Sequence, residues 1–97
     1  MIRHVVLFRW DDEMTDALED QLADELNAFA PGQPGVRAYR AGRDAGIIEG
    51  NYDFAVVGDF DDEDSYLAYR DHPQHQDIIG RLSRPHARER ASVQYEV

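Results

Sequence analysis

The chain has 97 residues, with twenty acidic side chains, ten arginines, no lysine and a formal net charge of -10. This length suits one domain over residues 1–97 with a thin core, and the negative charge argues against a nucleic-acid partner. The absence of cysteine excludes disulfides and thiolate chemistry. No apolar run or leader pattern indicates a membrane or secreted protein, so we expect a cytoplasmic location and no membrane partner.

The charges are segregated along the chain. The segment 11–25 carries eight acids and no base, whereas the segment 81–90 carries four arginines and one acid. This pattern is typical of a solvated acidic helix face and a basic segment. A contact between the two segments, within one subunit or between subunits, is the alternative.

The first predicted elements are a strand and an amphipathic helix. The strand, Ile2 to Arg9, is apolar on both faces, since His4, Val6 and Phe8 alternate with Val5 and Leu7. Turn and N-cap residues follow at positions 11–15. Apolar side chains then recur at helical spacing and predict about four turns of helix: Met14, Leu18, Leu22, Leu26 and Phe29. The prolines and glycines of 31–35 end this helix.

Two further strands are predicted in the middle of the chain. Val36 to Arg43 has mixed polarity, and a glycine-containing loop separates it from a third strand, Asp53 to Phe60. The third strand is again apolar on both faces, with Phe54, Val56 and Phe60 on one side and Ala55 and Val57 on the other.

The last third of the chain predicts two short helices and a strand. Acidic residues at 61–64 suit a helix start. Pro73 ends that helix near Asp71 and begins a second helix, which Pro85 closes. Ala91 to Val97 alternates between apolar and polar residues, which predicts a final strand with one buried face.

This element order, βαββαβ, predicts an α+β protein of the ferredoxin-like fold. That fold has a four-stranded antiparallel sheet in the spatial order 4-1-3-2 with the helices on one face. The two strands that are apolar on both faces fall at the two central positions, while the more polar strands fall at the edges. Polarity and topology therefore agree.

The apolar residues on the sheet face away from the helices predict a second subunit. Helices on one side leave Val5, Leu7, Ala55 and Val57 uncovered in a monomer, and apolar patches of this kind mark interfaces. A twofold homodimer that packs sheet against sheet buries this face and closes a dimeric α/β barrel. We therefore expect a homodimer through the open sheet face.

The segment from Tyr69 to His75 holds a phenol and two imidazoles at the predicted helix break. His75 falls in the first turn of a helix, where the dipole favours the neutral ring. Tyr69 and His75 then fit three roles: hydrogen bonds that stabilise the fold, ligand binding, or base and oxyanion stabiliser in proton abstraction next to a carbonyl. A metal site is a further alternative, with nitrogen ligands from three histidines and a nearby carboxylate: His4, His72, His75, with Asp71 or Asp77.

Five segments in order resemble the stress-responsive A/B barrel (Dabb) family. They are Ile2 to Phe8, the turn Pro34-Gly35-Val36, Tyr52 to Phe60, Tyr69 with His72-Pro73-Gln74-His75, and Val93 to Val97. The resemblance implies a dimeric α+β barrel and no single activity. A plant member, an olivetolic acid cyclase, closes a polyketide by aldol condensation with a tyrosine and a histidine. Those positions match Tyr69 and His75 here, and its pocket histidine matches His4. This sequence departs from the cyclase at Leu22 and Leu26, where the cyclase has bulky aromatic pocket residues, and at Gly58, where it has a pocket valine.

The sequence therefore predicts a homodimeric Dabb protein of unassigned activity, with a pocket between sheet and helices that suits a small apolar or aromatic ligand. The alternatives are an enzyme of cyclase or aldol type, with Tyr69 and His75 as catalytic residues, and a purely structural or assembly protein. No cofactor and no metal are predicted. The ligand pocket is expected to involve ten residues: His4, Val6, Phe8, Leu22, Leu26, Phe54, Val56, His72, Ile78 and Ile79.

Overall fold

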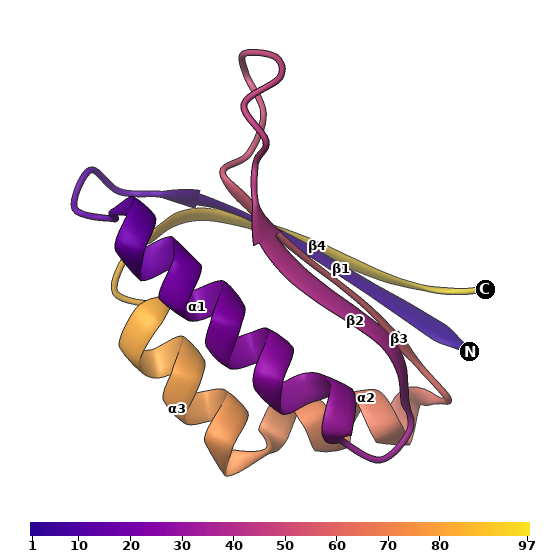
Figure 1. Cartoon of the computed structure of the whole chain (residues 1–97). Helices are drawn as coiled ribbons and strands as arrows, with labels where there is room; N and C mark the ends of the chain where they lie inside the picture. The colour runs from indigo at the N-terminus through magenta and orange to yellow at the C-terminus, as the bar shows by residue number, and fades with distance from the viewer.

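The fold consists of one sheet with a layer of helices on one side. The computed structural model describes residues 1–97. Its strands are β1 (Ile2–Trp10), β2 (Val36–Arg43), β3 (Phe54–Phe60) and β4 (Ala87–Glu96). Its helices are α1 (Asp16–Phe29), the short 3-10 helix η1 (Ala30–Gly32), α2 (Glu63–Asp71) and α3 (Pro73–Leu82). Figure 1 shows α1 and α3 side by side beneath the sheet, with the β2–β3 loop projecting from its upper end.

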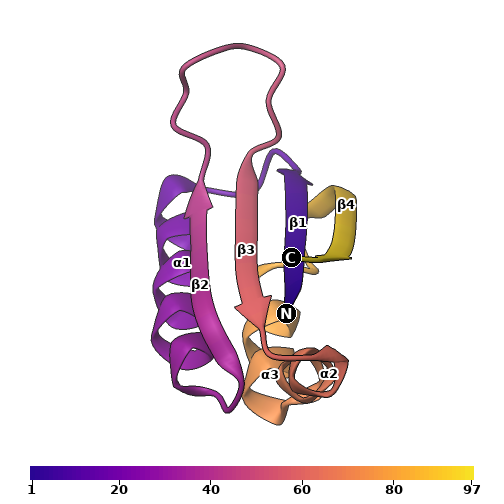
Figure 2. The same ribbon diagram turned by 90° about the vertical axis from the view of Figure 1, so that its right-hand side faces the viewer.

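The sheet has the predicted topology. Its spatial order is β2-β3-β1-β4, and every neighbouring pair is antiparallel. Figure 2 shows β2, β3 and β1 in this order, with β4 beyond β1. β1 and β3 occupy the centre, as their two-sided apolar pattern predicts, and the ferredoxin-like fold is confirmed. No helix is long and apolar enough to cross a membrane.

The core lies between the sheet and the helices. The alternate residues of β1 and β3 that face the helices are buried, and α1 buries Leu22, Leu26 and Phe29 against them. Phe54, Phe60, Leu22 and Ile78 are almost completely inaccessible to solvent. Full burial of such a side chain contributes roughly 1.5–3 kcal/mol to folding, so a few residues of this kind supply much of the stability of so small a chain.

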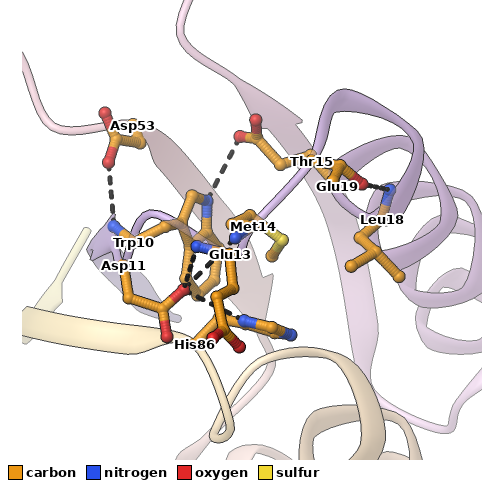
Figure 3. Close-up of polar contacts among 9 residues, drawn as sticks. All are labelled: Trp10, Asp11, Glu13, Met14, Thr15, Leu18, Glu19, Asp53 and His86. Atoms are coloured by element: carbon orange, nitrogen blue, oxygen red, sulfur yellow. Dashed lines mark hydrogen bonds and ion pairs between the residues drawn. The ribbon is translucent and has the colours of Figure 1, made fainter.

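The turn from β1 into α1 is built by local side-chain acceptors, as Figure 3 shows. The carboxylate of Asp11 accepts hydrogen bonds from the amides of Glu13 and Met14 at 3.1 and 3.2 Å. Thr15 is the N-cap of α1, and its hydroxyl accepts from the Leu18 amide at 3.1 Å. The predicted turn and cap at 11–15 are therefore confirmed.

The same corner joins distant segments. Trp10 donates its indole N–H to Glu19 at 3.2 Å, and its backbone amide donates to Asp53 at 2.8 Å. The His86 ring lies 3.1 Å from the Asp11 carboxylate, and Arg81 pairs with Glu25 at 2.6 Å. The acidic segment 11–25 and the basic segment 81–90 thus touch within one subunit, at these two pairs.

The break between α2 and α3 falls where proline predicts it. α2 ends at Asp71, and Pro73 occupies the first turn of α3. His72 between them has φ -58° and ψ 132°, and its Nδ1 accepts the Gln74 amide at 3.0 Å as the N-cap of α3. Extended backbone before proline, together with this cap, turns the chain sharply.

The prediction of a buried face on β4 is wrong for the single chain. β4 begins earlier than expected, at Ala87, and all ten of its residues are exposed. The reason is the side on which its apolar residues lie: Val93 and Tyr95 pair with Val5 and Arg3 on the sheet face that no helix covers. The face of β4 directed toward the helices carries polar residues, since Ser92 and Gln94 pair with the buried Val6 and His4.

The opposite face of the sheet carries an exposed apolar strip. Val5 pairs with both Val57 and Val93, and Arg3 pairs with Tyr95, so these residues share one face. Val57, Val93 and Tyr95 are 40%, 54% and 44% exposed. We call this surface the open sheet face; no segment of the chain covers it in Figure 1.

Candidate functional site: a cavity between sheet and helices

A cavity of about 250 Å³ lies between the sheet and the three helices. β1, β3, α1, α2 and α3 all contribute to its wall, and the start of β4 borders it. Its apolar lining comes from central strands and helices: Val6, Phe8, Leu22, Leu26, Val56 and Ile79. Most of these side chains are buried, which makes this part of the lining the inner end.

Most predicted site residues converge on this cavity. Tyr69 and His75 line it, as do His4 and the six apolar residues named above. They come from five different elements, so only the fold brings them together. Three predicted pocket residues lie outside it: Phe54, His72 and Ile78.

Each of these three residues has a structural contact that explains its position. Phe54 packs against Trp10 at a ring-centroid distance of 5.7 Å. Ile78 is 2% exposed and belongs to the core. His72 caps α3 through Nδ1 and meets Phe29 edge-on at 4.9 Å. These packing and capping contacts occupy the three side chains, and none of them lines the cavity.

His75 is held in one tautomer by the end of α2. Its Nδ1 lies 2.8 Å from the carbonyl oxygen of Arg70, which Gln76 also approaches at 2.7 Å. A carbonyl only accepts, so Nδ1 carries the proton and Nε2 keeps a lone pair. Burial lowers the pKa of His75, although the bond to Arg70 opposes this. The ring is therefore a neutral hydrogen-bond acceptor.

His4 has the opposite tautomer. The amide nitrogen of Gln94 donates to His4 Nδ1 at 2.8 Å, which leaves the ring proton on Nε2. The side chain is 4% exposed and packs on the Tyr66 ring at 4.9 Å. Burial, reinforced by Arg90 and His75, lowers the pKa of His4 to about 4. His4 thus supplies a neutral donor to the wall of the same cavity.

Tyr69 is positioned by a second tyrosine that the sequence did not indicate. The hydroxyls of Tyr39 and Tyr69 lie 2.6 Å apart, and the rings of Tyr69 and His75 are 4.4 Å apart. Burial raises the pKa of Tyr69 to about 12, so it stays a neutral phenol. When Tyr39 donates to Tyr69, the Tyr69 proton is free for a group in the cavity.

Gly58 makes room for this tyrosine pair. It is the cross-strand partner of Tyr39. A Cβ at position 58 would lie 2.9 Å from the Phe60 ring and 3.0 Å from the Tyr39 ring, closer than side chains tolerate. Glycine therefore allows Tyr39 to lie across β3 toward Tyr69.

The sequence did not identify the polar side of the cavity. Tyr66 lines it one helical turn before Tyr69, a spacing that offers a signal in hindsight. Six further lining residues carried no recognisable pattern: Arg70, Gln76, Ser83, Arg84, Ala87 and Arg90. They come from the end of α2, from α3 and from the residues that follow it, and three of them are arginines.

The alternative of a metal site has no geometric support. It requires His4, His72 and His75 to converge with a carboxylate, but no three His, Asp or Glu side chains lie close enough to hold a metal ion. His72 points its Nδ1 at the backbone of α3 instead. The cavity lining includes no carboxylate at all.

These features define a class: a small ferredoxin-like α+β protein with a mainly apolar cavity between sheet and helices. The model of the stress responsive A/B barrel domain family, Dabb, matches residues 2–97, and the chain belongs to that family. No curated protein matches the chain.

Solved structures agree with this assignment. A dimeric ferredoxin-like protein of unknown function from Thermobifida fusca YX is 40% identical, with a TM-score of 0.90 over 99% of this chain and 90% of that one. A Dabb family protein from Mesorhizobium loti is 23% identical, with a TM-score of 0.77 over 99% and 95%. A hydroxynitrile lyase from Passiflora edulis is 16% identical, with a TM-score of 0.80 over 99% and 92%. The Mesorhizobium loti and Passiflora edulis proteins are less than 25% identical to this chain, so their likeness shows a shared fold and no more.

Proposed function

We propose that the protein binds a small apolar or aromatic molecule in the cavity between its sheet and helices. The observation that carries the proposal is the combination of an open volume of about 250 Å³ with apolar inner walls and a few convergent polar groups. Sites for small molecules have this composition. A purely structural protein of this size gains stability by filling such a space, since empty volume costs packing energy.

The test uses a neutral single-ring probe, 3-phenylpropan-1-ol. Titration followed by NMR is expected to shift the signals of cavity residues such as Val6, Leu22 and Val56 while leaving the open sheet face unchanged. A matched variant, Leu22→Phe, adds volume to the inner wall and is expected to weaken binding. Exposed Ile47→Phe makes the same kind of change on the β2–β3 loop and serves as the control. Absence of saturable shifts at the cavity, both with this probe and with the carboxylic acid of the same shape, would refute the proposal.

The homodimer through the open sheet face belongs to the same proposal. Its support is the exposed strip around Val57, Val93 and Tyr95 and the dimeric state of the structural neighbour that is 40% identical. A cytoplasmic location is also proposed, and cell fractionation tests it.

A second candidate function is proton transfer at carbon, as in an aldol cyclase or a lyase. The specific observation is the tautomer of His75, whose free Nε2 lone pair lies in the same cavity wall as the neutral Tyr69 phenol. His75 would take a proton from the carbon next to a carbonyl, and the phenol would donate a hydrogen bond to the enolate oxygen. The lyase from Passiflora edulis illustrates that an enzyme uses this fold.

Deuterium exchange tests this candidate without knowledge of the natural substrate. Acetophenone in D₂O is expected to exchange its methyl protons faster with the protein than without it, as measured by NMR. His75→Gln and Tyr69→Phe are expected to abolish the acceleration while retaining binding of 3-phenylpropan-1-ol. Equal exchange by wild type and His75→Gln would leave ligand binding as the only function.

A further inference from the structure

Most arginines of the chain are neutralised by carboxylates, but two at the cavity are not. Ion pairs engage six of the ten: Arg3, Arg9, Arg37, Arg43, Arg70 and Arg81. Arg84 and Arg90 have no carboxylate within ion-pair distance, and both line the cavity. Of the four arginines without a carboxylate partner, Arg84 and Arg90 are the two that line the cavity.

The unpaired arginines stand at the mouth of the cavity. Both are exposed residues, whereas the apolar lining from β1, α1 and β3 is largely buried. Arg84 donates to the Gln76 side chain at 2.8 Å, and Arg90 donates to the Ser92 hydroxyl at 3.2 Å. These neutral acceptors orient the guanidinium groups without cancelling their charge. Each guanidinium has further N–H donors to offer a ligand.

The charge of these arginines reaches the groups that line the cavity. Arg90 on β4 contributes to the lowered pKa of His4, and Arg84 contributes to the lowered pKa of His75, in both cases after burial. Arg70 at the end of α2 also lines the cavity, although Asp71 pairs with it. With three arginines and no carboxylate in its lining, the cavity is a positive region in a protein of charge -10.

We propose that the ligand of this cavity is a small organic acid, whose carboxylate binds Arg84 and Arg90 at the mouth while its apolar or aromatic body fills the inner end. This inference rests on the proposed function and adds the chemical class of the ligand. Guanidinium groups bind carboxylates through paired, charge-assisted hydrogen bonds. A site that provides these donors and no acceptor carboxylate selects the anion over its neutral isostere.

The volume sets the size of the acid. A cavity of about 150 Å³ in another protein accommodates benzene. The 250 Å³ here therefore suits one ring with a short side chain. 3-Phenylpropionate meets both requirements, and 3-phenylpropan-1-ol is its neutral counterpart of nearly the same shape.

The experiment compares these two probes by calorimetric titration at pH 7. The acid is expected to bind about tenfold more tightly than the alcohol, or better. Raising the ionic strength from about 0.05 M to about 0.5 M should weaken the binding of the acid and leave the binding of the alcohol unchanged. The double variant Arg84→Gln/Arg90→Gln is expected to bind the two probes equally. Arg88→Gln removes another unpaired arginine that does not line the cavity, and should keep the preference.

The outcomes separate this inference from the proposed function. Equal binding of acid and alcohol by the wild type overturns the inference and leaves the proposed function standing, whereas binding of neither overturns the proposed function. A preference that survives in the double variant overturns the assignment to Arg84 and Arg90. Should the double variant fail to fold, the single Arg90→Gln variant, which breaks only one hydrogen bond, to Ser92, is expected to reduce the preference at least twofold. An unchanged preference there counts equally against the assignment.

Discussion

At the scale of single residues, the site consists of two neutral histidines with opposite tautomers. The Arg70 carbonyl holds the proton of His75 on Nδ1, and the Gln94 amide leaves the proton of His4 on Nε2. One ring therefore accepts and the other donates. Because each tautomer is set by one partner from a neighbouring element, the hydrogen-bonding character of the cavity depends on correct packing of α2 and β4.

The burial of His4 predicts that acid destabilises the fold. On folding, the pKa of His4 falls from 6.5 to about 4, mainly because the ring is buried and further because of the charges of Arg90 and His75. The ring of Tyr66 packs on His4 and contributes to this burial. Between these pH values the unfolded chain binds more protons than the folded one, so the free energy of unfolding decreases as the pH falls. The contribution is complete above about pH 6.5 and is lost toward pH 4. Its size is on the order of 3 kcal/mol.

Denaturant titrations across this pH range measure the effect. His4→Gln removes the titrating ring but keeps a polar side chain, so its stability is expected to decline less between about pH 6.5 and pH 4. Carboxylates with lowered pKa, such as Asp11 and Asp59, titrate in both proteins and cancel in the comparison. Identical pH dependence of wild type and His4→Gln would contradict the role of His4.

At the scale of elements, the break between α2 and α3 positions the site. It turns the chain so that Tyr69 from α2 and His75 from α3 line the same cavity. It also leaves the Arg70 carbonyl without a helical partner, and His75 and Gln76 satisfy it. The structural and chemical roles considered for His75 are therefore compatible, since one ring nitrogen supports the fold and the other is free.

The N-cap hydrogen bond of His72 predicts that substitutions at this position lower the stability by different amounts. His72→Ala removes the acceptor for the Gln74 amide, and the loss of a cap costs about 1 kcal/mol. In a domain of this size that lowers the melting temperature by about 4–8 °C. His72→Asn keeps an acceptor while losing the same contact with Phe29, so it should melt above His72→Ala in thermal unfolding followed by circular dichroism. Equal melting temperatures would show that the cap contributes nothing.

At the scale of the whole molecule, the helices cover one side of the sheet and leave the other apolar. The open sheet face joins Val5, Val57 and Val93 across three strands, with Tyr95 beside them. Exposed apolar surface on a chain of strongly negative charge is best explained by a second subunit. In the proposed dimer, the apolar strip would supply the attraction between the two subunits, and the negative charge would keep separate dimers apart.

A charge on the open sheet face is therefore expected to separate the subunits. Val57→Glu buries a carboxylate in the proposed interface and should raise the dissociation constant by about 100-fold or more. Sedimentation velocity measures the shift from dimer to monomer. Ile48→Glu makes the same change in an exposed residue of the β2–β3 loop and should leave the dimer intact. A wild-type monomer at about 10 µM would exclude the sheet-to-sheet dimer.

Much of the fold was predictable because its signals are local. The two-faced apolar pattern of residues 2–9 and 53–60 located the central strands, and Pro73 located the helix break. The burial of β4 was not predictable from local signals. Its alternation predicted a buried face, but its apolar residues Val93 and Tyr95 lie on the open sheet face, which no helix covers, and are therefore exposed in a single chain.

The sequence by itself determined the order of the elements, most of their limits and the sheet topology, because periodicity, proline and strand polarity act over a few residues. That His4, Tyr69 and His75 share a pocket was indicated by the resemblance to the Dabb family and not by a local pattern. Only the tertiary structure decided that the cavity is open, that Tyr39 supports Tyr69, and that Arg84 and Arg90 stand unpaired at its mouth. These features depend on the volume left between packed layers and on contacts between residues far apart in the chain. No local sequence pattern indicates the volume between the layers or the contacts between distant residues.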